Sequence, residues 1–159
     1  MNRTMIWFGR YEGWLRHLAK GVKCRDAECT KKAAALFDLM LPDHCIVVPM
    51  PSHMGLSCAM LDVANALPKG KRFIMNALES EPHESSQSQK KAGFAPAPFN
   101  MKFDPAALER CPKVDFDGGI YVIDNVLCTG VTATAAIKAI QDYSGLDAKV
   151  VTIAYATWR

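Results

Sequence analysis

The residues best suited to chemistry lie in one stretch of the chain, YVIDNVLCTGVTATAA, which begins at Tyr121. An apolar, β-branched run ends there on a carboxylate, Asp124, and a carboxylate removed from water needs a partner. Asn125 follows it, and both side chains carry oxygens that accept hydrogen bonds from hydroxyl groups. We therefore expect this pair to hold a ligand with hydroxyl groups, such as a sugar.

A phosphate-binding turn is predicted directly after these two residues. Gly130 lets the backbone turn and approach a ligand closely. The amides of residues 128–132 are expected to point outward at the start of a helix, where the helix dipole and unpaired N–H groups favour an anion. Thr129 and Thr132 add hydroxyl donors that match phosphate oxygens. Hydroxyl acceptors followed by a phosphate cradle predict a ribose 5-phosphate held lengthwise.

The local pattern also has a purely structural interpretation, because an acid or threonine between a strand and a helix often only caps that helix. Other phosphate-binding interpretations fail on detail. The chain contains no G-x-x-x-x-G-K-[ST] motif, and no G-x-G-x-x-G motif follows a strand. A haloacid-type phosphatase would have a second aspartate two residues after Asp124, where this chain has Val126.

Helical and strand-like stretches alternate around this motif. The spacing of apolar residues predicts helices over 11–22, from Asp26 to just before Pro42, from Ser57 to about 67, and from 131 to about 143. Apolar, β-branched runs predict strands over 45–51, 71–78, 118–124 and 148–158. This order predicts an α/β fold: one domain over 1–159, with a parallel twisted sheet flanked by helices. Ligands of such sheets bind beyond the carboxyl ends of the strands, which would gather the turns after Pro49 and Ile123 and the tail after Tyr155.

The composition is that of a soluble globular protein. Half of the 159 residues are hydrophobic, 22% are charged and the formal net charge is +3, with no long basic run. We therefore expect no nucleic acid as a direct ligand and no membrane partner, while a homodimer stays open. The six cysteines form no C-x-x-C pair, and the start of the chain lacks the apolar core of a signal peptide. These features predict a reduced, cytoplasmic protein, in which Cys24, Cys29 and His17 are a weak candidate for a metal site.

The region 79–105 is rich in Ser, Gln, Pro and Lys and has little periodicity. A connection of this length within one domain is usually functional or disordered. On composition alone such a polar segment is more often a linker, in which Lys90 and Lys91 are ordinary solvated charges. We nevertheless expect a mobile loop here, for the reason given by the resemblance below.

Four segments, in the same order, resemble the ComF-like family of type I phosphoribosyltransferases. The stretch from Tyr121 resembles the motif by which these enzymes bind 5-phosphoribosyl 1-pyrophosphate (PRPP): an apolar strand, two acidic residues and then xxxTGxT. The other three segments are YEGWLRHLAKGVK, IVVPMPSH followed by GLS, and SSQSQKKAG. The likeness extends from about Tyr11 to Tyr155.

The resemblance implies a type I phosphoribosyltransferase fold with PRPP and Mg²⁺ as ligands and a small nitrogenous acceptor. Asp124 and Asn125 would hold the ribose hydroxyls and, with Lys90, form the catalytic set. The remaining roles fall to three groups: the 5-phosphate cradle of Cys128, Thr129, Gly130, Val131 and Thr132; the pyrophosphate turn of Pro51, Ser52 and His53; and the closing loop around Gln87, Gln89, Lys90 and Lys91. The resemblance implies no metal ligand from the protein itself. Trp158 is a candidate for stacking on the base, although a terminal Trp also packs readily on a surface.

This sequence departs from the family pattern in three places. Asn125 replaces the second acid, the turn after Pro51 lacks arginines, and Cys128 stands where purine phosphoribosyltransferases have an acidic base. Cys24 and Cys29 do not reproduce the four-cysteine zinc module with which ComF-like proteins often begin. Two alternatives therefore stay open: a non-catalytic PRPP- or nucleotide-binding regulator or DNA-uptake accessory protein on the same fold, and a general sugar-phosphate binder.

Overall fold

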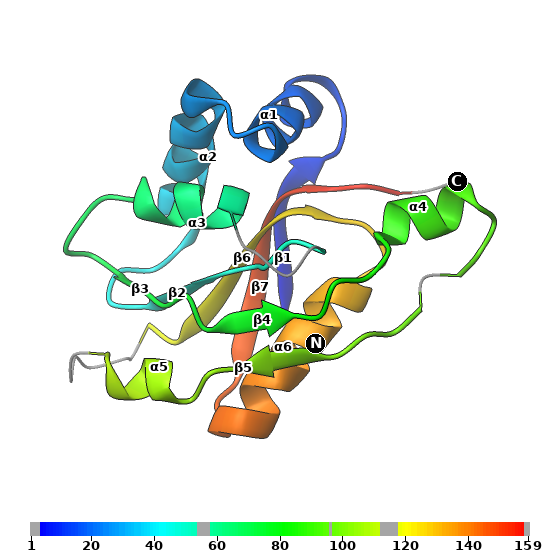
Figure 1. Ribbon diagram of the computed structural model, residues 1–159. Helices are drawn as coiled ribbons and strands as arrows, with labels where there is room; N and C mark the ends of the chain where they lie inside the picture. The colour runs from blue at the N-terminus through cyan, green and yellow to red at the C-terminus, as the bar shows by residue number, and fades with distance from the viewer. Residues whose placement is uncertain (1–3, 54–57, 96, 112–117, 158–159) are drawn as a thin grey trace.

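The fold was analysed in a computed structural model, which describes residues 4–53, 58–95, 97–111 and 118–157. Its centre is a five-stranded parallel sheet with the strand order β1-β7-β6-β2-β3 (Figure 1). The strands are β1 (Met5–Arg10), β2 (Ile46–Pro49), β3 (Phe73–Ile74), β6 (Ile120–Leu127) and β7 (Ala148–Tyr155). β2 is fully buried and β7 largely so, as their continuous apolar runs predict for a sheet covered on both faces, whereas β6 alternates between buried and half-buried residues. The predicted α/β class with a parallel sheet is confirmed.

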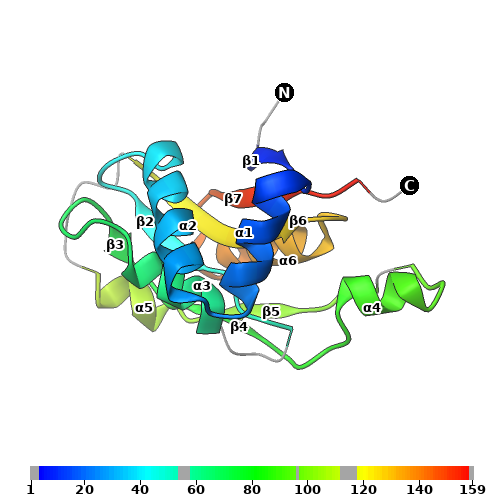
Figure 2. The same cartoon turned by 90° about the horizontal axis from the view of Figure 1, so that it is seen from above.

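Helices cover both faces of this sheet. Three of them, α1 (Gly13–Lys23), α2 (Ala27–Met40) and α3 (Cys58–Asn65), lie on one side, and α6 (Val131–Ser144) lies on the other (Figures 1 and 2). The predicted helices are confirmed within a few residues at their ends. Asp26 caps α2 by accepting a hydrogen bond from the Cys29 N–H at 2.8 Å. The predicted cap of α3, Ser57, lies outside the described residues.

The direction in which the chain adds strands reverses between β2 and β6. From β2 the chain passes through α3 to β3 at one edge, whereas from β6 it passes through α6 to β7 toward the other edge. Neighbouring crossovers therefore diverge at the carboxyl ends of β2 and β6 and leave a crevice there. Such a switch point is the usual ligand site of an open parallel sheet.

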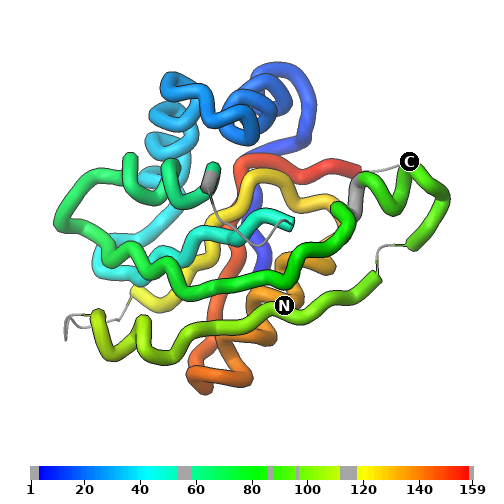
Figure 3. The backbone as a smooth tube through the Cα atoms, viewed as in Figure 1, coloured from blue at the N-terminus to red at the C-terminus, as the bar shows by residue number. Residues whose placement is uncertain are grey.

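The region 79–105 differs from the long loop expected from the sequence. It contributes to β4 (Leu78–Ser80) and contains α4 (Ser86–Lys91) and β5 (Met101–Phe103), with α5 (Ala106–Glu109) directly after it. β4 and β5 form an antiparallel pair, whose path across the front of the sheet is followed most easily in Figure 3. Their alternating burial covers only three residues each, which is too short for periodicity to reveal. The strand predicted over 71–78 is likewise divided between β3 and the start of β4.

Two features near the start of the chain were not predicted correctly. Residues Met5–Arg10 form the edge strand β1, which pairs with β7. Trp14 falls on the apolar stripe of the helix predicted over 11–22, but it is 59% exposed and packs edge-on against Phe8 with ring centroids 5.9 Å apart. Because β1 is an edge strand, this end of α1 has no further strand to cover it. Among the described residues, no helix is long and apolar enough to span a membrane.

Candidate functional site

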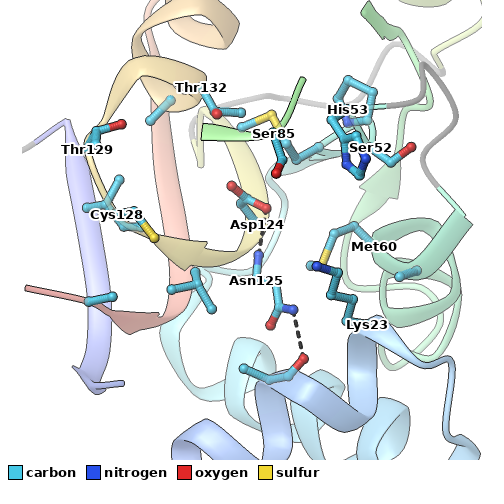
Figure 4. Close-up of a pocket in the computed structure, with 18 of the residues that line it drawn as sticks. Lys23, Ser52, His53, Met60, Ser85, Asp124, Asn125, Cys128, Thr129 and Thr132 are labelled. Atoms are coloured by element: carbon cyan, nitrogen blue, oxygen red, sulfur yellow. Dashed lines mark hydrogen bonds between the residues drawn. The ribbon is translucent and has the colours of Figure 1, made fainter. Parts of the chain in front are cut away.

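A cavity of about 290 Å³ occupies the switch point. It is bounded by the segments that follow β6 and β2, by one face of α1, by the start of α3 and by the chain around β4 and β5. Figure 4 shows its polar side chains, with Asp124 between the turn at Cys128 and Thr129 on one side and Ser52 and His53 on the other. The segments after Pro49 and Ile123 thus meet in one site, as the sequence predicted.

Asp124 is the only carboxylate among the described residues that line this cavity. The parallel pairing of β6 with β7 and β2 fixes its position, because it follows Ile123, the partner of Pro49. Burial raises the pKa of Asp124 to about 6, and a hydrogen bond from the backbone N–H of Asn125 at 2.7 Å opposes that rise. The folded protein therefore keeps at the cavity a carboxylate that its own residues only partly satisfy.

The side chain of Asn125 forms a hydrogen bond with the neighbouring helix α1 and not with Asp124. Its amide nitrogen, Nδ2, donates a 2.8 Å hydrogen bond to the backbone carbonyl of Ala19 in α1 (Figure 4). Its amide oxygen, Oδ1, is buried and has no hydrogen-bond partner among the described residues. The predicted contact of this oxygen with a ribose hydroxyl stays a prediction, and the amide has the further role of joining α1 to β6.

The turn between β6 and α6 contains the glycine turn and helix start that the sequence predicted. Gly130 occupies the N-cap of α6 with φ +80°, in the left-handed region that favours glycine. The side chain of Thr129 accepts a 3.4 Å hydrogen bond from the Val131 N–H. The first turn of a long helix leaves backbone N–H groups without intrahelical acceptors, and α6 begins at Val131, beside the cavity. Thr132 also lines the cavity, and its contact with a phosphate stays a prediction.

On the opposite side, His53 is joined by a second histidine that the sequence did not predict to be there. His83 follows β4, and its backbone N–H donates to the His53 carbonyl at 2.9 Å. The two rings are 6.4 Å apart, and His83 is held by stacking on Phe99 at 3.8 Å. Both histidines line the cavity, together with Ser52 and Ser85. The short turn after Pro51 therefore gains polar groups from the β4–β5 region.

Two lysines of α1, Lys20 and Lys23, also line the cavity and were missed by sequence reasoning. They follow Ala19, one of the buried residues of α1, so their helix carries them to the rim while its apolar face packs on the sheet. The only signal in the sequence is their spacing on that helix. With the two histidines, they surround one acid with several groups that attract anions.

The other predicted residues lie in several places. Lys90 and Gln89 belong to α4 and do not line the cavity, and the Gln89 side chain accepts a 2.8 Å hydrogen bond from the Ala97 N–H within its own segment. Cys128 and Pro51 line the cavity, whereas Val131 does not. Trp158 and the Gln87 side chain lie outside what the structure describes.

The weak metal candidate of Cys24, Cys29 and His17 is not brought together, because the described residues contain no cluster of three or more metal-binding side chains. Cys29 is buried against Gly21, where an added Cβ would approach its Sγ to 2.2 Å. The thiol therefore fills the α1–α2 contact. In comparisons with known proteins, no family model and no curated protein matched this chain.

Proposed function

We propose that the protein is a phosphoribosyltransferase of the type I fold, which binds PRPP and transfers ribose 5-phosphate to a nitrogenous acceptor. The observation that carries the proposal is the arrangement along the cavity. A half-buried acid, Asp124, which is the only carboxylate among the described residues of the cavity, lies between two segments that suit anions: the start of α6 and the turn at His53 (Figure 4). A pentose with a phosphate at each end has this same order of groups.

Each end of the cavity supports one part of that ligand. Backbone N–H groups and the hydroxyls of Thr129 and Thr132 suit the 5-phosphate. Asp124 accepts hydrogen bonds from ribose hydroxyls, and charged acceptors make bonds about twice as strong as neutral ones. His53 and His83, with Lys20 and Lys23, suit the pyrophosphate. Gly130 suits the turn of this cradle, because its φ of +80° lies in the left-handed region that favours glycine.

In the proposed reaction, the bond between the anomeric carbon and the pyrophosphate oxygen breaks, and a bond from the acceptor nitrogen to that carbon forms. Pyrophosphate leaves with the bonding electrons, and the acceptor loses a proton to solvent. Mg²⁺ would bind together with PRPP, coordinated by its phosphates, because Asp124 is the only carboxylate lining the described cavity. Such an ion would supply charge compensation, while the chain positions the ligand and excludes water.

The first test is release of pyrophosphate from PRPP and Mg²⁺ with a panel of nitrogenous bases. We expect release with at least one base, and a loss of about 100-fold or more in kcat/KM for Asp124→Asn, in the range found for one preorganised electrostatic contact. Lys149→Gln, a change outside the cavity, is the matched control and should match the wild type. No release with any base would contradict the proposal.

A second candidate, a non-catalytic PRPP-binding protein, is favoured by two observations. The amide nitrogen of Asn125 is used to hold α1, and Lys90 does not line the cavity, so one member of the expected catalytic set is partly committed to the fold and another lies outside the cavity. Thermal shift separates the candidates. PRPP at about 100 times Kd should stabilise either by roughly 2.7 kcal/mol, and only the enzyme then releases pyrophosphate.

The same measurement tests the third alternative, a general sugar-phosphate binder. Such a protein would be stabilised by ribose 5-phosphate alone, with no further effect of pyrophosphate or Mg²⁺. For a PRPP site we expect stabilisation by PRPP to exceed that by ribose 5-phosphate, because the histidine side of the cavity is filled only by the former.

A further inference from the structure

A second recess opens directly beside the Asp124 cavity. It is formed by the end of β1, the start of α1, the end of α4 and the segment after β7. Tyr11, Lys20 and Ala156 line both the recess and the cavity, so the two are continuous. A molecule bound in this recess would therefore lie next to the ligand held by Asp124.

The recess is strongly basic. Arg10, Arg16, Lys20 and Lys91 line it, and Glu12 is the only carboxylate among the described residues around it. This formal excess of three equals that of the whole chain, which has 19 Lys and Arg against 16 Asp and Glu. All four cations are exposed, and none forms an ion pair with another described residue. The charge elsewhere is balanced, so this recess is where the chain concentrates its attraction for anions.

Aromatic rings accompany these cations. Tyr11 and Tyr155 are both half-buried and line the recess. Tyr155 is held in place by stacking on Trp7, with centroids 5.1 Å apart and planes 28° apart. A ring that is fixed in this way presents flat apolar surface to a ligand, while the guanidinium groups of the arginines match carboxylate geometry.

We propose that this recess is the acceptor subsite and that the acceptor is a flat ring carrying a negative charge, such as a ring carboxylate. The inference rests on the proposed phosphoribosyl transfer and adds the class of acceptor to it. A ring placed between the tyrosines and the arginines reaches the Asp124 cavity through the boundary shared at Tyr11 and Lys20. A neutral ring would leave the cations without a partner and would gain less. The same cations would also suit the pyrophosphate of PRPP, so the experiment must separate these two sources of negative charge.

Matched pairs of acceptors test the proposal: nicotinate against nicotinamide, and orotate against uracil. We measure pyrophosphate release from PRPP and, by calorimetry, binding of each ring to the PRPP-loaded protein. The expected result is a preference of at least about tenfold for the carboxylated member of a pair, the effect of one charge-assisted contact. Arg10→Gln with Arg16→Gln should remove that preference and leave the KM or Kd for PRPP unchanged. Lys31→Gln, which changes an exposed cation outside both sites, should preserve it.

Three results would contradict the assignment of the recess as the acceptor subsite. These are equal use and binding of both members of each pair, a raised KM or Kd for PRPP in the double variant, or no ring bound by protein that still binds PRPP. The last result leaves the Asp124 site standing. Binding of a carboxylated ring that the double variant loses supports the recess even without turnover, which would contradict only the proposed catalysis.

Discussion

At the scale of single residues, the proposed ligand site depends most on Asp124. Because burial raises the pKa of Asp124 to about 6, the ionised carboxylate destabilises the empty protein at neutral pH. Its ordinary pKa is 3.8, so folding favours the protonated form. The contribution of Asp124 to the free energy of unfolding is therefore fully present below about pH 4, and it is lost as the pH rises through about 6.

This sign gives the first prediction. Asp124→Asn should raise the free energy of unfolding of the ligand-free protein at pH 7.5 by up to about 3 kcal/mol, since one pKa unit is worth about 1.4 kcal/mol. The gain should vanish near pH 4, where both side chains are neutral. Urea unfolding at the two pH values measures it. A variant less stable than the wild type at pH 7.5 would mean that the carboxylate is structural.

Asn125 gives a prediction of opposite sign. Asn125→Asp restores the second acid of the family pattern, but a carboxylate cannot donate to the Ala19 carbonyl that Asn125 now satisfies. Two acceptors would face one another beside Asp124. We expect a loss of about 1–3 kcal/mol in the free energy of unfolding, measured by urea unfolding at pH 7.5. Unchanged stability would show that the bond to α1 contributes nothing.

At the scale of elements, the turn before α6 can be tested against the turn after it. Gly130 and Gly145 bracket this helix with φ +80° and +71°. An alanine Cβ at Gly130 would meet only Met5 at ordinary contact distance, and at Gly145 it would meet nothing. Both substitutions should therefore cost about 1–2 kcal/mol through the left-handed conformation alone.

The two variants should differ in ligand binding. Gly130→Ala disturbs the phosphate cradle and should weaken binding of ribose 5-phosphate by about tenfold or more, whereas Gly145→Ala should bind as the wild type does. Calorimetry on folded protein separates this effect from stability. Equal binding of ribose 5-phosphate by both variants would contradict the prediction that the turn at Gly130 binds the phosphate.

Sequence patterns predicted the elements that contain their own signals. Asp26 and Pro42 bracket α2, and apolar runs mark β2, β6 and β7. β1 and the β4–β5 pair were not predicted, because an edge strand and three-residue strands depend on partners distant in the chain. The site divides in the same way. Asp124 and its turn are contiguous in sequence, while Lys23 and His83 reach the cavity only through packing.

At the scale of the whole molecule, Arg72 connects α2 to the far edge of the sheet. Its side chain is 2% exposed, donates to the carbonyls of Leu41 at 2.6 Å and Pro42 at 3.0 Å, and forms an ion pair with Asp38. Bonding to Arg72 lowers the pKa of Asp38. Because α2 packs against α1, which lines both the cavity and the recess, this anchor supports the site from a distance.

Arg72→Met should lower the free energy of unfolding by about 3 kcal/mol or more, since it leaves Asp38 and the end of α2 without their donor. Arg110→Met, which breaks an exposed pair with Asp104, should have a much smaller effect. Thermal unfolding compares them. Equal effects would show that Arg72 is not an anchor.

The most direct measurement is a crystal structure grown with ribose 5-phosphate. We predict that the phosphate lies within hydrogen-bond distance of the backbone N–H groups at Gly130–Thr132 and that a ribose hydroxyl donates to the carboxylate of Asp124. A cavity that holds only water in the presence of saturating ligand, or a phosphate bound elsewhere with Asp124 facing solvent, would contradict it.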